Sequence, residues 1–544
     1  MSGTDNEARA DLASRWRSQG RWADRTIADD MERAAREHPD SPVVFHGSTR
    51  ADVTTVAGLY ARGLRAAAGL ARIGVRPGDT VAIQVPNCLE GAVAHAAGWL
   101  AGAVVAPIVP IYGPREVGFI LRQSRARVFI LARSWRGRDR AELLAGLGGL
   151  PALSDVVVTG GQLPGTVAWD ELEADDPGTA AAGFAPPAVD PDDRCLLVYT
   201  SGTTADPKGV QHSHNTLLSE VRSMVADPDG ESAVKYLAAF PAGHVAGVLG
   251  LLRVLVGGVP SVVMEQWDPA AAARLVAEHR VTHCAGAPIY LATLLDEGER
   301  SGHDLSSLTN FLTGAADVSP ALIERADRAG IAAYRSYGSS EHPTISSGEP
   351  TDPAVRRAGT DGRLTPGSEV RIVDDADRQL PAGTDGEIVS RGPEQFTGYL
   401  ASELNADAFL PGGWLRTGDI GHLDEAGYLT VTGRKKDIIV RGGEKISAKE
   451  VEDVLIGHPA AAEVAVVGAP DERYGEHVCA FVVLRPGAAL DLKDVRQHFA
   501  GSGLARQKTP EQLVITGTLP RTAAGKVQKF TLRDSLRSPV SPRS

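Results

Sequence analysis

The sequence predicts a large α/β domain followed by a smaller α+β domain, on three observations. The chain has 544 residues and a mass of 57.1 kDa, which is too long for one compact core. From about residue 53 to 345, short apolar strand-like runs alternate with helical patterns, as in βαβ architectures. After residue 433 a shorter α+β pattern begins. We therefore expect the domain boundary close to Lys435, with domains at 1–434 and 435–544.

The first region supplies most of the expected elements. We expect strands at residues 80–85, 128–131, 195–199, 236–240, 261–264 and 281–285. We expect helices between them, including residues 89–100, 215–225, 269–279 and 289–297. Residues 160–193 are rich in Gly, Ala, Pro and Asp, which predicts a loop or a connector between subdomains.

The later part of the chain has a different pattern. From residue 362 to about 433, short alternating segments are broken by Gly and Asp, which predicts antiparallel β structure. These segments are residues 369–373, 386–390 and 428–432. Beyond them we expect a helix at 447–458, strands at 463–467 and 478–484, and a helix at 492–500.

Composition excludes some classes of function. The hydrophobic fraction of 43% and the charged fraction of 23% are those of an ordinary globular protein. A net charge of −12, without a basic stripe, argues against a nucleic-acid partner. The N-terminus lacks an apolar signal core, and no stretch reaches the roughly 20 apolar residues of a membrane span. We expect a cytoplasmic protein, with peripheral membrane contact and a homodimer left open.

The cysteines point to a reducing environment. Cys88, Cys195, Cys284 and Cys479 are scattered through the chain. They lack the paired spacing of a zinc site or of a disulfide framework. This usage is typical of a cytosolic protein.

Residues 199–210 carry the strongest local signal, the sequence YTSGTTADPKGV between a strand-like and a helical run. Its glycine and hydroxyl residues leave N–H and O–H donors to face phosphate oxygens, and Lys208 adds a cation. We therefore predict a phosphate-binding loop rather than an ordinary polar turn. A P-loop ATPase or kinase is the competing class. Its G-x-x-x-x-G-K-[ST] pattern does not fit, because Lys208 follows Pro207 and precedes Gly209.

Further motifs occur in the order that one enzyme family shows. They are LARIGVRPGDTVAIQVPN from residue 70, FPAGHVAG from 240, SYGSSEH from 336, GWLRTGDIGHLDEAGYLTVTGRKKDIIVRGGEKIS from 413 and LPRTAAGK from 519. In these motifs the chain resembles the adenylate-forming superfamily of acyl-CoA synthetases, luciferases and peptide-synthetase adenylation domains. The resemblance implies an α/β fold whose large N-terminal domain has two α/β sheet subdomains and a distorted β-barrel. It also implies a small mobile C-terminal α+β domain.

The resemblance implies roles for residues of the large domain. Tyr337 would stack on adenine, and Glu341 would ligate Mg²⁺ together with Thr200. Pyrophosphate leaves readily only when a metal and cations neutralise its charge. The loop over the β- and γ-phosphates would comprise Thr200, Ser201, Gly202, Thr203, Thr204 and Lys208. Further nucleotide-binding positions would be Gly314, Ala315, Gly338 and Ser340, the last in place of the family's usual threonine.

The ribose and C-terminal motifs add a second set of residues. Asp419 matches the carboxylate that holds both ribose hydroxyls, and Arg434 matches an arginine that contacts the nucleotide. Lys436 occupies the family's hinge position. Lys526 resembles the catalytic lysine that bridges the attacking carboxylate and the α-phosphate. The pair Gly442 and Gly443 lies where pantetheine passes close to the backbone, although an ordinary turn is the competing explanation.

The remaining motif bears on the substrate. His244 resembles the catalytic-site histidine between the acid pocket and the thiol tunnel. Peptide-synthetase adenylation domains carry an aspartate here, and residues 240–250 contain none, which disfavours an α-amino acid. The segments that resemble the pocket wall, 245–250, 314–316 and 342–343, are apolar and small. We therefore expect an uncharged aliphatic, alicyclic or aryl carboxylic acid of small to medium size.

The expected enzyme is an AMP-forming acid–thiol ligase that uses ATP, Mg²⁺ and coenzyme A. Acid and MgATP would give acyl-AMP and pyrophosphate, and a thiol would then release AMP. Three alternatives stay open: transfer to a carrier-protein pantetheine, activation of another oxyanion such as nitrite for an amine acceptor, and a nucleotide-binding regulator with little turnover.

Overall fold

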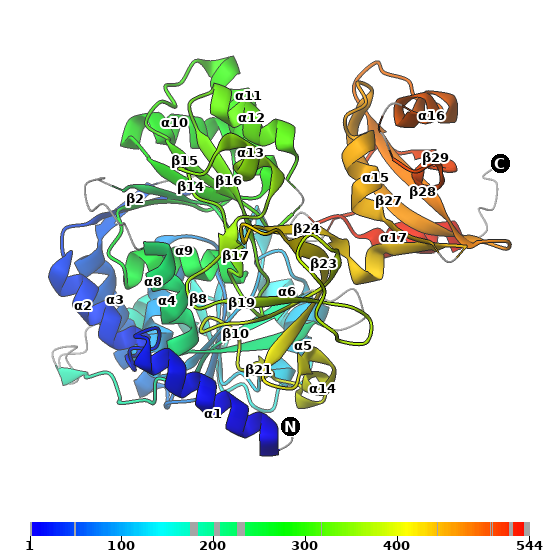
Figure 1. The fold of residues 1–544 in the computed structure, drawn as a ribbon. Coiled ribbons are helices and arrows are strands. Elements are labelled where there is room, and N and C mark those ends of the chain that lie inside the picture. The colour runs from blue at the N-terminus through cyan, green and yellow to red at the C-terminus, as the bar shows by residue number, and fades with distance from the viewer. Residues whose placement is uncertain are drawn as a thin grey trace. The chain divides into compact units, whose positions relative to one another are not determined.

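The structure is a computed structural model, shown as a ribbon in Figure 1. It describes residues 3–47, 51–174, 183–200, 207–225, 234–316, 318–442, 444–500, 502, 504–521 and 526–537. The chain forms two compact units: unit 1 comprises Met1–Glu369 and Ser390–Leu415, and unit 2 comprises Val370–Val389 and Arg416–Ser544. The boundary expected near Lys435 concerns a movable domain and stays a prediction.

An eight-stranded sheet forms one part of unit 1. Its order is β21-β11-β10-β4-β3-β5-β8-β9, with parallel pairing from β10 to β9 and antiparallel pairing at β10–β11 and β11–β21. Every residue of β3 and β5 is buried, as in a parallel sheet covered on both faces. The strands are β3 (Thr80–Gln84), β4 (Val104–Pro107), β5 (Val128–Ala132), β8 (Asp155–Thr159), β9 (Val167–Ala168), β10 (Arg194–Thr200), β11 (Lys208–Ser213) and β21 (Gly398–Tyr399).

A nine-stranded sheet forms the other part of unit 1. Its order is β18-β17-β16-β15-β14-β12-β13-β1-β2, and the strands from β16 to β1 all run parallel. Parallel strands end at one edge of a sheet, where α/β proteins commonly bind ligands. The strands are β1 (Pro42–His46), β2 (Ala51–Thr55), β12 (Tyr236–Ala238), β13 (Ser261–Met264), β14 (His283–Gly286), β15 (Asn310–Thr313), β16 (Ala332–Tyr337), β17 (Ser346–Ser347) and β18 (Arg363–Leu364).

Helices fill the space between the two sheets and cover their outer faces (Figure 1). The largest apolar cluster joins α2, α3, α4, α8 and α9 to strands of both sheets, and two further clusters pack α10–α12 and α5 against the outer faces. The helices of unit 1 are α1 (Gly3–Ser18), α2 (Ile27–Glu37), α3 (Val56–Arg72), α4 (Leu89–Leu100), α5 (Pro114–Gln123), α6 (Ala141–Ala145), α7 (Trp169–Glu173), α8 (His214–Val225), α9 (Val245–Leu255), α10 (Pro269–His279), α11 (Pro288–Ser301), α12 (Pro320–Arg328), α13 (Ala354–Gly359) and α14 (Asn405–Ala408).

A curled antiparallel sheet follows in the chain and confirms the predicted barrel-like element. Its order is β19-β20-β23-β22, and β24 pairs with β23. The strands are β19 (Glu369–Val373), β20 (Gly386–Arg391), β22 (Phe409–Leu410), β23 (Trp414–Leu423) and β24 (Leu429–Arg434).

Unit 2 ends in the expected α+β domain, in which a second antiparallel sheet, β26-β25-β28-β27, carries β29 parallel to β28. Two apolar clusters stabilise it, one of them joining α15 and α16 to the sheet. The elements are β25 (Ile438–Arg441), β26 (Glu444–Ser447), α15 (Ala448–Leu455), β27 (Ala461–Asp471), β28 (Gly475–Leu484), α16 (Leu492–Ala500), β29 (Gln512–Ile515) and α17 (Lys529–Arg537).

The structure confirms the α/β fold class and corrects one expectation. Within residues 160–193, which we predicted as a loop or connector, β9 pairs with β8, and the short helix α7 follows. Trp169 and Leu172 of α7 are buried, so these apolar side chains anchor a segment whose composition resembles a loop. None of the helices in the described part of the chain is long and apolar enough to cross a membrane.

Candidate active site

The hairpin of β10 and β11 carries the predicted phosphate loop. Its register places Thr200 opposite Lys208, so both residues lie at the open end from which the loop departs. Residues 195–199 of β10 are buried, which anchors this end in the sheet. The predicted loop residues that fall outside the described residues are Ser201, Gly202, Thr203 and Thr204.

A tight loop follows β16, at the end of the parallel strands of the second sheet. Tyr337 is the last residue of β16 and pairs with Ser346 of β17. A Cβ atom on Gly338 would lie 1.9 Å from the carbonyl oxygen of Pro343, so only glycine fits there. The Ser339 hydroxyl accepts hydrogen bonds from the backbone N–H groups of Glu341 and His342, at 3.2 and 3.3 Å. The chain direction around Glu341 is therefore closely defined.

Tyr399 links Glu341 to Lys208. Its hydroxyl donates a 2.7 Å hydrogen bond to Glu341 Oε1, and Lys208 Nζ lies 5.1 Å from the centroid of the Tyr399 ring. The backbone N–H of Phe396 donates to the carbonyl oxygen of Glu341 at 2.7 Å. Burial, and then the Glu341 carboxylate, raise the pKa of Tyr399, so its hydroxyl stays a donor at neutral pH. One tyrosine thus contacts both the predicted metal ligand and the predicted phosphate-binding lysine.

Two buried histidines support the same loop. His212 Nε2 lies 2.8 Å from the carbonyl oxygen of Ser340, and burial lowers the pKa of His212 to about 4. The neutral ring therefore donates its Nε2 proton to this carbonyl. The ring nitrogens of His342 lie 3.0 Å from Ser390 Oγ and 3.2 Å from Ser368 Oγ. We expected His342 in the wall of the acid pocket, but it is fully buried in this network instead.

Gly314 and Ala315 follow β15, the strand beside β16. A Cβ atom on Gly314 would lie 2.8 Å from the Ser336 carbonyl oxygen, so the two strand ends approach as backbone against backbone. Ala315 has a φ of 65°, a left-handed conformation that costs a residue with a Cβ about 1 kcal/mol or more. The predicted nucleotide-binding positions Gly314, Ala315, Tyr337 and Gly338 therefore share one sheet edge.

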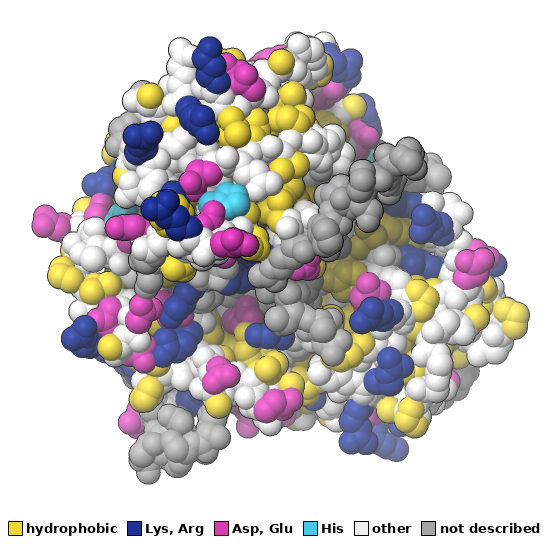
Figure 2. Space-filling model, turned by 90° about the vertical axis from the view of Figure 1, so that its right-hand side faces the viewer, with side chains coloured by type: hydrophobic (Ala, Val, Ile, Leu, Met, Phe, Trp, Pro, Cys, Tyr) yellow, Lys and Arg dark blue, Asp and Glu magenta, His cyan; other side chains and the backbone are white. Residues whose placement is uncertain are grey.

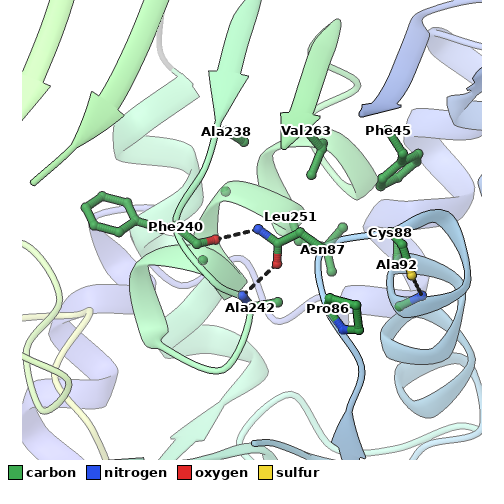
Figure 3. Close-up of a pocket in the computed structure, with 13 residues that line it drawn as sticks. Phe45, Pro86, Asn87, Cys88, Ala92, Ala238, Phe240, Ala242, Leu251 and Val263 are labelled. Carbon is green, nitrogen blue, oxygen red and sulfur yellow. Dashed lines mark hydrogen bonds between the residues drawn. The ribbon is translucent and has the colours of Figure 1, made fainter. Parts of the chain in front are cut away.

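An apolar pocket lies among α9, the start of α4 and the ends of three strands (Figure 3). Its empty volume is about 360 Å³, including its opening to solvent. Asn87 supports one side, because its side-chain amide bonds the carbonyl oxygen of Phe240 and the N–H of Ala242 at 2.8 and 2.9 Å. None of the lining residues is charged: they are Phe45, Pro86, Asn87, Cys88, Gly91, Ala92, Ala238, Phe240, Ala242, Gly247, Gly250, Leu251 and Val263.

His244 precedes α9 and occupies its N-cap position. The turn before it is tight, because a Cβ atom on Gly243 would lie 2.6 Å from the backbone of Val109. A Cβ atom on Gly247 would lie 2.0 Å from the carbonyl oxygen of Pro241. The half-buried His244 is thus held on the same turn and helix that form part of the pocket wall.

In unit 2, Asp419 and Arg434 face one another across β23 and β24. Arg434 Nε lies 2.8 Å from Asp419 Oδ1, and the Asp419 side chain is only 7% exposed. The Thr417 hydroxyl accepts from the Asp419 N–H at 3.1 Å and donates to the carbonyl oxygen of Ile388 at 2.7 Å. The structure therefore brings together the residues predicted to bind the ribose and the nucleotide.

The other predicted residues of unit 2 lie on exposed segments. Desolvation, and then repulsion by Arg434, lower the pKa of Lys436 to about 8. Gly442 has a φ of 58° and donates its N–H to Tyr474, whereas Gly443 lies outside the described residues. Lys526 is exposed, beside a bridge between residues 521 and 527.

The side-chain donors of this site determine which metal ion it could hold. Among the described residues, no group of three or more His, Cys, Asp or Glu side chains could hold a metal ion. Mg²⁺ is bound through one or two carboxylates, substrate phosphates and waters rather than by an all-protein cage. Glu341 and Thr200 offer a carboxylate and a hydroxyl of this kind, so the residues fit Mg²⁺ when nucleotide phosphates complete its coordination.

Sequence reasoning missed Tyr399 and His212. Tyr399 lies 58 residues from Glu341, and His212 lies 128 residues from Ser340, so no local spacing indicates either contact. The pairing of Tyr399 with β11 shows why it reaches Lys208.

Comparison with known proteins yields relatives over nearly the whole chain. A medium-chain fatty-acid–CoA ligase of Escherichia coli strain K12 is 36% identical over 529 residues, covering 96% of this chain and 92% of the relative. The solved structure of the anthranilate CoA ligase AuaEII with anthranoyl-AMP has a TM-score of 0.84 at 26% identity, covering 94% and 98% of the two chains. The amide bond synthetase McbA of Marinactinospora thermotolerans has a TM-score of 0.83 at 28% identity, covering 94% and 99%.

Two family models match successive parts of the chain. The model of the AMP-binding enzyme matches residues 31–400, and the model of the AMP-binding enzyme C-terminal domain matches residues 450–526. The first match includes the hairpin, the Glu341 loop and Tyr399, and the second ends at Lys526. The resemblance predicted from the motifs is thus confirmed, and the chain belongs to the AMP-binding enzyme family as an adenylate-forming ligase.

Proposed function

We propose that this enzyme joins a carboxylic acid to coenzyme A through an acyl-adenylate. The observation that carries the proposal is the contact of Tyr399 with both Glu341 and Lys208. Tyr399 thus brings a carboxylate and an ammonium group together, next to the hairpin end at Thr200. This combination suits the binding of a metal-bound triphosphate.

In the first half-reaction, a carboxylate oxygen of the acid attacks the α-phosphorus of ATP. The bond between the α-phosphorus and its bridging oxygen breaks, and pyrophosphate leaves. Lys208 would face the charge that develops on pyrophosphate, and Glu341 with Thr200 would hold Mg²⁺. When bound, Mg²⁺ neutralises phosphate charge. We assign Lys526 to the attacking carboxylate and the α-phosphate, as its motif implies.

In the second half-reaction, the thiolate of coenzyme A attacks the acyl carbon, and the bond to the AMP oxygen breaks. The proton of the thiol goes to a base or to water, and AMP leaves. We assign the pantetheine path to Gly442 and Gly443, and the mouth between acid and thiol to His244. We also propose that residues 435–544 move about Lys436 between the two halves, because the two steps need different groups.

We propose that the acid is uncharged apart from its reacting carboxylate. The apolar pocket beside α9 supports this, because a charged tail would be desolvated there without a partner. Burial of each methylene contributes about 0.8 kcal/mol, so selectivity among homologous acids should be gradual. ATP and coenzyme A are cytoplasmic compounds, and we place the enzyme there.

A different acceptor is the second candidate function. The similarity to an amide bond synthetase at a TM-score of 0.83 makes an amine acceptor a specific alternative, beside a carrier-protein pantetheine. The first half-reaction is the same in each case. Acceptors therefore have to be compared directly.

One experiment tests these proposals. Uncharged acids are screened for pyrophosphate release with MgATP, and each active acid is then given coenzyme A, a pantetheine-loaded carrier or an amine. We expect AMP and pyrophosphate from ATP, and acyl-CoA as the main product. ADP and phosphate as the main products would contradict adenylation, whereas an amide or an acyl carrier would contradict only the acceptor.

A further inference from the structure

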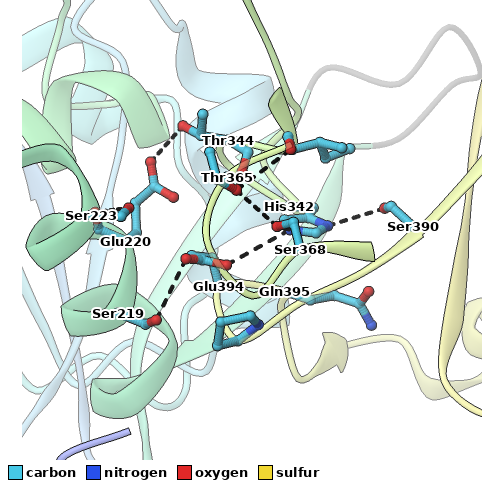
Figure 4. A network of polar contacts seen from close by, with 12 residues as sticks. Ser219, Glu220, Ser223, His342, Thr344, Thr365, Ser368, Ser390, Glu394 and Gln395 are labelled. Atoms are coloured by element: carbon cyan, nitrogen blue, oxygen red, sulfur yellow. Dashed lines mark hydrogen bonds and ion pairs between the residues drawn. The ribbon is translucent and has the colours of Figure 1, made fainter. Parts of the chain in front are cut away.

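Two buried carboxyl groups lie near Thr344 and His342, which follow Glu341 in the chain (Figure 4). Glu220 comes from α8 and is 0% exposed, and Glu394 comes from the segment before β21 and is 1% exposed. Two buried carboxylates near one another repel each other and lose their hydration. Protonation of one member removes this repulsion.

The hydrogen bonds of Glu220 and Glu394 leave carboxyl oxygens that could carry a proton. The Thr344 hydroxyl donates to Glu220 Oε1 at 2.5 Å, and the Ser219 hydroxyl lies at the limit of a bond to Glu394 Oε1, at 3.5 Å. Within the described residues, neither Glu220 Oε2 nor Glu394 Oε2 has a hydrogen-bond partner. A protonated carboxyl can donate from one of these oxygens, which a carboxylate cannot.

The cations around the pair do not neutralise both charges. Arg253 of α9 attracts Glu220 and lies 3.7 Å from the centroid of the Tyr236 ring, and Arg21 attracts Glu394. His342 Nε2 lies 3.9 Å from Glu394 Oε2, but burial lowers the pKa of His342 to about 3, so the ring is neutral.

Arg222, on the same helix as Glu220, pairs with Asp30 instead. Burial raises the pKa of Glu220. Burial and the charge of Glu220 raise the pKa of Glu394. The pair therefore retains a proton at a pH where ordinary carboxyl groups have lost theirs.

The pair touches the segments that build the site. Thr344 belongs to the loop that carries Glu341, and the segment after Glu394 supplies Phe396 to the Glu341 backbone. The helix of Glu220 directly follows β11, which starts at Lys208. A second negative charge here would push apart the elements that set the position of Glu341.

We propose that Glu220 and Glu394 are positioning residues that together retain one proton and thereby hold the Glu341 loop ready for MgATP. The proposal rests on the proposed function for its ligand. Loss of the proton at alkaline pH should loosen the loop and weaken MgATP binding. The direction of this pH dependence follows from the raised pKa. The protonated pair is present at low pH and is lost as the pH rises through the pKa.

The test is the dissociation constant of MgATP, measured by calorimetry from pH 6.5 to 9.5. Wild type, Glu394→Gln, Glu220→Gln and the control Glu297→Gln are compared. Glu297 is also buried, but it pairs with Arg300 on α11. We expect wild type and the control to lose up to about tenfold in affinity per pH unit at the alkaline end. The amide variants should lose much less, because glutamine cannot ionise.

Parallel profiles for wild type and both amide variants would overturn the proposal. If both variants fail to fold, difference infrared spectra of the wild-type protein decide the matter. A protonated-carboxyl C=O band that is present at pH 7 and lost at pH 9.5 supports the pair, and its absence at pH 7 refutes it. These experiments measure MgATP binding and protonation, so their failure would not contradict the proposed function. The proposed function is contradicted if no acid yields pyrophosphate.

Discussion

Gly250 provides a graded test of where the acyl group binds. It lies inside α9 and lines the apolar pocket, and a Cβ atom there would meet only Ala238 Cβ, at 3.9 Å. Gly250→Ala therefore fits without a clash. It should also stabilise the helix, because alanine is favoured over glycine there by up to about 1 kcal/mol. Gly250→Leu adds roughly the bulk of four methylenes to the pocket.

The magnitude follows from the volume that the new side chain takes. Each acyl methylene in the pocket contributes about 0.8 kcal/mol, or roughly fourfold in kcat/KM. Gly250→Leu should thus cost about 3 kcal/mol, roughly 200-fold, for the longest acids that wild type accepts. Gly250→Ala should cost roughly fourfold for those acids, and the shortest acids should be unaffected by either change.

The assay is pyrophosphate release with a series of straight-chain acids of increasing length. The shortest acid is the internal control, because it does not reach the blocked region. Melting temperatures of the three proteins check that the fold is retained. An equal loss at every chain length, or no loss at any length, would show that the acyl chain does not enter this pocket.

Three further changes test the assigned residues. Tyr399→Phe removes the hydrogen bond to Glu341, and kcat/KM for MgATP in pyrophosphate release should fall roughly 10- to 100-fold; an unchanged value would refute the role of Tyr399. Lys526→Ala should slow acyl-AMP formation by roughly two to three orders of magnitude while added acyl-AMP still yields thioester. Equal loss of both half-reactions in a folded protein would contradict this assignment. Asp419→Asn removes the charge that faces Arg434, and KM for ATP should rise about tenfold in steady-state assays. An unaltered KM would exclude a ribose contact.

Much of the fold could be predicted because its signals are local. Buried parallel strands such as β3 and β5 read as continuous apolar runs, and a helix such as α10 begins with the Asp–Pro cap pattern. The segment of β9 and α7 was missed for the opposite reason. Only two large apolar side chains, Trp169 and Leu172, anchor its helix, and the surrounding Gly, Pro and Asp residues favour a loop.

The candidate site likewise contains residues that local motifs indicate and residues that they do not. Glu341, Asp419 and Lys526 stand in motifs that can be recognised within a few residues. Tyr399 and Glu394 act through partners that are distant in the chain, and nothing in their own neighbourhood indicates burial or contact. A periodic pattern predicts which face is buried, but not which two buried faces meet.

The glycines of the site show how the distant parts depend on one another. Gly314 and Gly338 allow backbone to approach backbone at the ends of β15 and β16, where any Cβ atom would lie within 3 Å of a carbonyl oxygen. This crowding brings the Glu341 loop close to the sheet edge, so its position depends on what packs beneath it. His212 donates to Ser340 of this loop, and Glu220 accepts from its Thr344. The position of the loop therefore depends on the residues packed against it, and we expect the Glu220–Glu394 pair to hold it only while one of the two carboxyl groups keeps its proton.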